Sequence, residues 1–295
     1  MISRNPSPAP ARAAFGAMTL LLLAACDRPA ERVERTHAAA PSPTAAAALP
    51  PAATSAEVTG RFGSGQPVTV VLHVRAPDGA PLGPDALQIV HTERLHVLAV
   101  DPSLTDYSHS HPVAGATPGD WAFSFTPKQD RPYHLWLDMT PVGGKQAYVL
   151  VPVNAAASGV PAAKTLATQA SVGGLDATLA FDAPLVAGQP AMGHVSVRRG
   201  GKPFAGLEPV MGAYAHIVGI ADDFETIAHV HPLGAEPTAT GQRGGPALDF
   251  HIEPTKPGFL KLFAQVRVDG RDIFLPFGVD VAGPDTAAAP AAMHH

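Results

Sequence analysis

The chain has 295 residues, which is enough for one large domain or two ordinary domains. Charged residues make up 15% of it and the formal net charge is −5 at pH 7, so the chain lacks the strongly basic character that a nucleic-acid partner favours. Its 32 prolines and 28 glycines suit many short strands joined by turns better than they suit long helices.

Residues 1–25 have the pattern of an export signal. Arg4 and Arg12 form a basic start, and an apolar stretch of 13 residues follows at 13–25. That length matches the core of a signal peptide and is too short to cross a bilayer as a mature helix. Cys26, the only cysteine, follows directly, so a disulfide within the chain and a thiolate metal cluster are both excluded.

The sequence Leu-Ala-Ala-Cys that ends at Cys26 resembles the lipobox of bacterial lipoproteins. The resemblance implies cleavage before Cys26, lipidation of Cys26, and attachment to a membrane surface on the periplasmic side of the cell envelope. Asp27 resembles the inner-membrane retention signal of enteric bacteria and slightly favours the inner membrane. An ordinary signal peptide followed by a chance cysteine is the alternative.

The remainder divides by composition into two bodies and three connecting segments. Residues 26–56 are rich in Ala, Pro, Thr and Ser and are expected to form a disordered tether. Residues 155–170 form a shorter linker of the same kind, and residues 284–295 form a disordered tail. The two bodies are therefore residues 57–154 and 171–283.

The two bodies are copies of each other. Five blocks occur in the same order in both, and they pair 65–75 with 188–198, 91–112 with 211–232, 123–127 with 250–254, 133–136 with 260–263, and 148–153 with 274–279. A shared order of five blocks indicates an internal duplication.

Each copy reads as a series of short strands. Apolar and β-branched runs such as 68–74, 95–100 and 121–125 are separated by turn signals, for example Pro-Asp-Gly at 77–79. About seven short strands in roughly 100 residues predict an all-β fold with two tandem immunoglobulin-like β-sandwich domains. Small up-and-down or jelly-roll barrels are the alternatives.

Three histidines and a proline are the only identical positions in the aligned blocks 91–112 and 211–232. The pairs are His96 and His216, His109 and His229, His111 and His231, and Pro112 and Pro232. If the segments around the turn at 101–106 pair as antiparallel strands, His96 lies opposite His109 or one residue off. His111 then projects from the same face as His109. The same construction groups the counterparts in the second copy, so each copy is predicted to hold a metal ion.

The donor set favours copper. Imidazoles without a thiolate suit copper, zinc, nickel and iron, and the affinity of such sites peaks at copper(II), with zinc the less favoured choice. Position 91, His91 in the first copy and Met211 in the second, could add a ligand only where a bulge or loop turns it toward His96. The alternative is that His96, inside an apolar strand, is a buried and hydrogen-bonded core histidine. The histidines without a counterpart are expected to have surface or packing roles: His73, His134, His194 and His251.

The segments 215–218 (AHIV), 229–232 (HVHP) and 256–263 (KPGFLKLF) resemble exported bacterial domains of the YtkA-like and FixH-like kind. They resemble more loosely the immunoglobulin-like copper carriers of the CopC kind. The resemblance covers about 100 residues of the second copy, and it implies small β-sandwiches linked in several cases to copper handling or oxidase assembly. The N-terminal histidine ligand of CopC-type proteins does not carry over, because Cys26 would be the acylated N-terminus.

No enzymatic activity is predicted. His229, His231 and Glu236 superficially match the first cupin metal motif, but Asp223 stands where that motif has Gly, and the second cupin motif is absent. No Gly-x-Ser-x-Gly nucleophile motif occurs. The sequence therefore predicts a membrane-anchored periplasmic copper-binding protein involved in metal handling or tolerance. The rival is a non-catalytic envelope module that binds another envelope protein and uses its histidines only for structure.

Overall fold

A computed structural model describes residues 55–59, 63–151 and 163–284 of the chain. The expected signal peptide, the tether up to residue 54 and the tail from residue 285 lie outside these residues. Both repeats belong to one unit. Among the described residues, no helix has the length and apolar character needed to cross a membrane.

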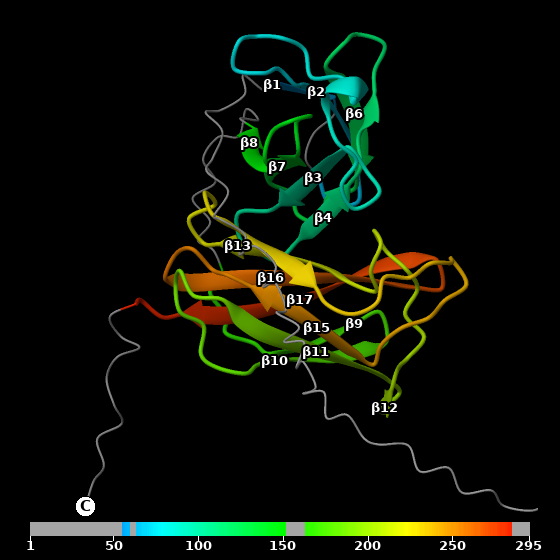
Figure 1. The fold of residues 1–295 in the computed structure, drawn as a ribbon, viewed down its shortest axis with the longest axis vertical. Helices are drawn as coiled ribbons and strands as arrows, with labels where there is room; N and C mark the ends of the chain where they lie inside the picture. The colour runs from blue at the N-terminus through cyan, green and yellow to red at the C-terminus, as the bar shows by residue number, and fades with distance from the viewer. Residues whose placement is uncertain (1–54, 60–62, 152–162, 285–295) are drawn as a thin grey trace, which may run out of the picture. The chain divides into compact units, whose positions relative to one another are not determined.

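The first repeat is a sandwich of two antiparallel sheets (Figure 1). Its strands are β1 (Ser55–Thr59), β2 (Val68–His73), β3 (Leu95–Val100), β4 (Tyr107–Ser110), β5 (Val113–Ala114), β6 (Asp120–Phe125), β7 (His134–Met139) and β8 (Ala147–Val151), with one short 3-10 turn, η1 (Pro84–Ala86). The sheets have the orders β1-β2-β6-β5 and β4-β3-β7-β8. Lettered in chain order these are A-B-E-D and C′-C-F-G, which is the strand order of an immunoglobulin-like sandwich.

The second repeat has the same plan. Its strands are β9 (Gln169–Val172), β10 (Leu175–Phe181), β11 (Ala191–Arg199), β12 (Lys202–Pro203), β13 (His216–Ala221), β14 (Ile227–Pro232), β15 (Ala247–Ile252), β16 (Gly258–Val268) and β17 (Arg271–Val281). One sheet contains β17, β16 and β13, and the other contains β15, β11, β10 and β9. The prediction of an all-β chain with two tandem immunoglobulin-like sandwiches is therefore confirmed.

Strand β14 connects the two sheets of the second repeat. Its first half, Ile227 to His229, pairs with β13, and its second half, Val230 to Pro232, pairs with β15. In the first repeat the same path is divided into β4 and β5, with His111 and Pro112 between them. Proline has no N–H for the ladder, which is consistent with a strand that stops or changes partner at this point.

The sandwiches begin within segments that the sequence assigns to connections. In β1, Ser55 and Ala56 pair with β2, although the sequence places them in the tether. In β9, Gln169 and Ala170 pair with β10, although the sequence places them in the linker. Short polar and small residues at an edge strand lack the alternation that would mark them as strand.

Strands β3 and β13 are buried along all six residues, without the usual alternation. One face of each strand packs inside its own sandwich, and the other face packs in an apolar cluster that contains residues of both repeats. In that cluster the Tyr107 ring stacks on the Phe263 ring with centroids 4.5 Å apart. Burial on both faces explains why these strands read as continuous apolar runs in the sequence.

Candidate metal centre

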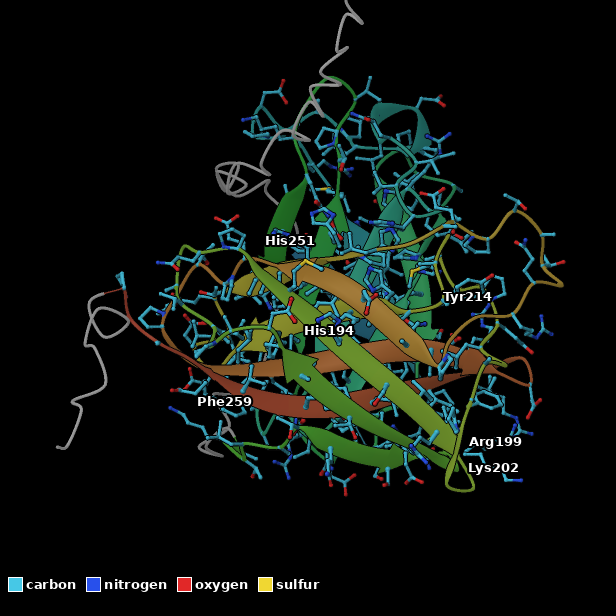
Figure 2. The ribbon with its side chains drawn as sticks, turned by 60° about the horizontal axis from the view of Figure 1, so that its bottom comes forward. His194, Arg199, Lys202, Tyr214, His251 and Phe259 are labelled. Carbon is cyan, nitrogen blue, oxygen red and sulfur yellow. The ribbon has the colours of Figure 1, made fainter. Side chains whose placement is uncertain are left out.

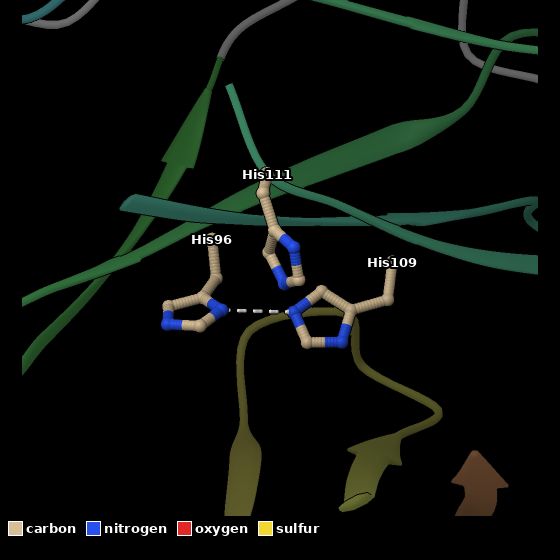
Figure 3. Close-up of side chains that lie close together, drawn as sticks. All are labelled: His96, His109 and His111. Carbon is tan, nitrogen blue, oxygen red and sulfur yellow. Dashed lines mark hydrogen bonds between the residues drawn. The ribbon is translucent and has the colours of Figure 1, made fainter. Parts of the chain in front are cut away.

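Three predicted ligands of the first repeat come together. One ring nitrogen from each of His96, His109 and His111 lies within 4.8 Å of the other two. Figure 3 shows the three rings directed toward a common region. His96 comes from β3, His109 comes from β4, and His111 follows β4 by one residue.

The register between β3 and β4 differs from the expected one, which placed His96 opposite His109 or one residue off. Leu98, not His96 or its neighbour, lies opposite His109, and Val97 lies opposite Ser110. His96 therefore meets His109 diagonally and faces the end of β4, where His111 follows. Diagonal neighbours on one face are still within reach of long side chains, so the three rings meet despite the shift.

Hydrogen bonds fix the orientation of two of the rings. His96 Nε2 donates to the carbonyl oxygen of Val90 at 3.0 Å, and His109 Nδ1 donates to Oε1 of Gln265 at 3.0 Å. In the neutral rings the other nitrogens then carry lone pairs, and these two nitrogens, His96 Nδ1 and His109 Nε2, lie 3.2 Å apart. In this tautomer neither of them can donate to the other. Around metal-binding histidines, the ring N–H that points away from the metal is usually held by a hydrogen-bond acceptor in this way.

The third ring supplies a nitrogen that no protein group satisfies. His111 Nε2 is buried and has no hydrogen-bond partner among the residues that the structure describes. Its other nitrogen, Nδ1, lies 4.0 Å from Oε1 of Glu93. Leaving a buried polar atom without a partner costs about 1–3 kcal/mol, so a cation at this point would remove a penalty as well as gain a ligand.

The electrostatics keep the trio neutral. Burial, together with the smaller effects of the nearby His96 and His111, lowers the pKa of His109 to about 3. Burial also lowers the pKa values of His96 and His111. At neutral pH all three rings are therefore unprotonated, which is the form that binds a metal ion.

The spacing suits a tetrahedral ion after a small adjustment. Two nitrogens that are each about 2.0–2.1 Å from one tetrahedral zinc lie about 3.3 Å apart. The 3.2 Å separation of His96 Nδ1 and His109 Nε2 fits that value. The wider limit of 4.8 Å for the full trio means that a bound ion would draw at least one ring inward.

The site predicted in the second repeat stays a prediction, because one of its three side chains, that of His229, lies outside the described part of the chain. Within the described part of the chain, the trio of the first repeat is the one such group of histidine, cysteine and acidic side chains. His216 is buried, and its ring lies 4.8 Å from the His109 ring, centroid to centroid. His231 belongs to the half of β14 that pairs with β15, where it faces His251. The backbone of His229 pairs with Val218, and its side chain is outside the described part.

Two residues near the trio were not expected from strand alternation. His91 lies in a tight turn with φ 50°, and its ring centroid is 6.4 Å from that of His96. Strand alternation would direct the side chain at position 91 away from His96. The turn instead places it beside the trio, as the sequence allowed for a bulge or loop at this position. Gln265 is 2% exposed in an apolar strand. A lone amide in such a strand is the signal that could have identified it as the partner of a buried polar group.

No curated protein matches the chain significantly. Among solved structures, domains 4 and 5 of the S-layer protein SbsC are 11% identical, over 64% of this chain and 76% of that chain, with a TM-score of 0.23. The D00-D0 domain of intimin is 12% identical over 76% and 98%, with a TM-score of 0.22. The fibronectin(III)-like modules of CbhA from Clostridium thermocellum are 12% identical over 81% and 100%, with a TM-score of 0.19.

One family model matches both sandwiches, at residues 52–157 and 170–283. The two matches together cover well over half of the chain and coincide with the two repeats. The chain therefore belongs to the family described as "Domain of unknown function (DUF8832)", of which it contains two tandem copies.

Proposed function

We propose that this chain is a periplasmic, membrane-anchored metal-binding protein that holds copper through His96, His109 and His111 and acts in metal handling or tolerance without catalysis. The observation that carries the proposal is the convergence of three imidazole nitrogens within 4.8 Å. In the trio, His96 Nδ1 and His109 Nε2 carry lone pairs in the tautomers set by the hydrogen bonds of these rings, and His111 Nε2 is buried without a described partner.

The choice of copper rests on the donor set. The trio offers imidazole nitrogens and no thiolate, which suits copper and zinc better than calcium or magnesium. The affinity of such donors is highest for copper(II), so we expect zinc to be bound more weakly than copper. Two further imidazoles lie near the trio. The ring centroid of His91 is 6.4 Å from that of His96, and the ring centroid of His216 is 4.8 Å from that of His109, so either ring could become an additional ligand after a side-chain movement.

Export and anchoring support the same proposal. The apolar stretch before Cys26 and the Leu-Ala-Ala-Cys sequence are those of a lipoprotein signal, and Asp27 favours the inner membrane. Cys26→Ser should release the protein from the membrane fraction of the envelope, because two acyl chains can no longer be attached. Retention of the Cys26→Ser protein in washed membranes would contradict lipid anchoring.

The binding proposal is tested by equilibrium dialysis of the untagged protein against Cu(II) and Zn(II). The variant His109→Leu removes a central ligand, and His73→Leu removes a histidine of the same repeat that lies outside the trio. We expect one tightly held ion to be lost in His109→Leu and retained in His73→Leu. Equal metal content in the wild type and His109→Leu would overturn the proposal.

A second function has a specific observation in its favour. The histidines also form contacts at hydrogen-bond distance, and His109 reaches Gln265 of the other repeat. A purely structural network of this kind would suit a lipid-anchored module that binds another envelope protein. Under that reading His109→Leu lowers the stability of the metal-free protein, and added copper stabilises neither protein.

A further inference from the structure

Three neighbouring strands of the second repeat carry a row of potential ligands. In β11 and β15, Met192 lies opposite His251, and in β15 and β14, His251 lies opposite His231. The three residues therefore occupy one line across the sheet. Directly opposed residues have Cβ atoms about 4.5–5.5 Å apart, so His251 lies beside each of the other two, which are separated by two strand spacings.

The row lies on the outer face of the sandwich. Its neighbours along the strands, Gly193, Phe250 and Val230, are buried in or against the core. Because side chains alternate between the two faces of a strand, the row points away from that core. Met192 and His251 are partly exposed, and His231 is exposed, so an ion can reach them from solvent.

The first repeat provides an internal comparison. At the positions that align with Met192 and His251 it has Thr69 and Ser124, which are also directly opposed, and their hydroxyls are hydrogen-bonded to each other at 2.9 Å. The second repeat thus has a thioether and an imidazole in place of two hydroxyls, beside a histidine that both repeats share.

The surroundings of the row are negatively charged. The next row on the same face contains His194 and Asp249, and His194 contacts Asp249 and Asp182 at 2.9 Å each. His194 and His251 are labelled in Figure 2. The negative charges of the two carboxylates, Asp182 and Asp249, attract a cation to this part of the surface. A pocket of about 710 Å³ is lined by His231, Asp249 and a second thioether, Met211, among other residues. Of the three residues of the row, His231 lines this pocket.

We propose that Met192, His231 and His251 form a second metal site, for Cu(I), that is separate from the trio of the first repeat. A thioether is a soft ligand that suits Cu(I), whereas calcium and magnesium prefer oxygen donors. Two imidazoles and one thioether complete a three-coordinate set without a thiolate. The two repeats then differ in the ion they prefer: the trio has imidazoles only, and the row includes sulfur.

The test is an anaerobic titration of the untagged full-length protein with Cu(I) in competition with a chromophoric Cu(I) chelator. The variant Met192→Thr/His251→Ser installs the residues that the first repeat has at these positions, so the sheet is expected to remain folded. We expect this variant to lose one Cu(I) equivalent, or to bind it more than about tenfold more weakly, since loss of an outer-shell partner alone costs at least that much. Circular dichroism and the melting temperature check the fold.

Two matched variants separate this site from its surroundings. His194→Ser removes another histidine of the same face, and His109→Leu removes the trio, so both should keep the Cu(I) equivalent of the row. Loss of an ion in His109→Leu but not in Met192→Thr/His251→Ser would overturn the second site and leave the proposed function intact. Loss of an ion in Met192→Thr/His251→Ser but not in His109→Leu would support a site at the row and contradict a site at the trio.

A direct readout follows the methionine methyl groups by NMR while Ag(I), a redox-inert soft cation, is added. The Met192 methyl resonance is identified by its absence in the double variant. It should shift with the first equivalents of Ag(I) in the wild type and in His194→Ser. A Met192 methyl resonance that does not move would overturn the proposal.

Discussion

His111 has a buried nitrogen, Nε2, with no hydrogen-bond partner in the described chain. The substitution His111→Phe keeps an aromatic ring and replaces that nitrogen with carbon. We expect the metal-free variant to be as stable as the wild type or more stable by about 1 kcal/mol, because an unsatisfied polar atom is removed. Copper should raise the melting temperature of the wild type and not that of the variant.

Differential scanning calorimetry with and without Cu(II) makes this comparison. A histidine that served only packing and hydrogen bonding would give the opposite pattern, with a clear loss of stability in the metal-free variant and no effect of copper on either protein.

The lowered pKa of His109 makes stability depend on pH. Its folded-state pKa is about 3, whereas the ordinary value is 6.5, so between these values the unfolded chain binds a proton that the folded chain excludes. The contribution of neutral His109 is complete above pH 6.5 and is lost as pH falls from 6.5 toward 3, with a slope of up to about 1.4 kcal/mol per pH unit. His96 and His111 act in the same direction.

Urea unfolding of the metal-free wild type and of His109→Gln over this pH range measures the effect. The stability of the variant should fall less steeply, because one excluded proton has been removed. Parallel curves for the two proteins would show that His109 titrates normally in the folded state.

At the scale of elements, β11 packs closely because it has glycine at position 193. A Cβ at Gly193 would overlap the ring of Phe250, which occupies the directly opposed position of β15. We expect Gly193→Ala to destabilise the protein by about 1–3 kcal/mol, since the Phe250 ring must leave its place in the core. Gly241→Ala, where no atom lies within 4 Å, should change stability by less than about 0.5 kcal/mol. Chemical denaturation of both variants tests the difference.

Much of the element pattern could be read from the sequence, because it is local. The runs that became β3 and β6 are apolar or alternating, and the internal duplication gives the same strand order twice. The histidine trio of the first repeat also followed from spacing alone, since His109 and His111 share a face whatever the exact register.

The surroundings of the histidines in the second repeat could not be read in this way. In both repeats the chain changes its partner strand close to these histidines: β14 pairs first with β13 and then with β15, and in the first repeat β4 pairs with β3 and β5 with β6. That change depends on contacts between distant strands, which no local pattern records. In the second repeat it places His231 opposite His251, which was expected to have only a surface or packing role.

At the scale of the whole molecule, an apolar cluster includes side chains of both repeats, so the repeats should unfold together. Tyr107 of the first repeat is buried, and its ring stacks on Phe263 of the second with an interplanar angle of 10°. Its hydroxyl has no hydrogen-bond partner in the described chain, so the ring contributes mainly through apolar contact.

Tyr107→Ser removes the ring, and Tyr107→Phe removes only the hydroxyl. We expect the wild type and Tyr107→Phe to unfold in one calorimetric transition, with Tyr107→Phe equally stable or more stable by about 1 kcal/mol. Tyr107→Ser should separate the transition into two. The substitution weakens the cluster that joins the repeats, whereas each repeat keeps a core of its own. A single transition in Tyr107→Ser, shifted no further than in Tyr107→Phe, would mean that the repeats are coupled by something other than this cluster.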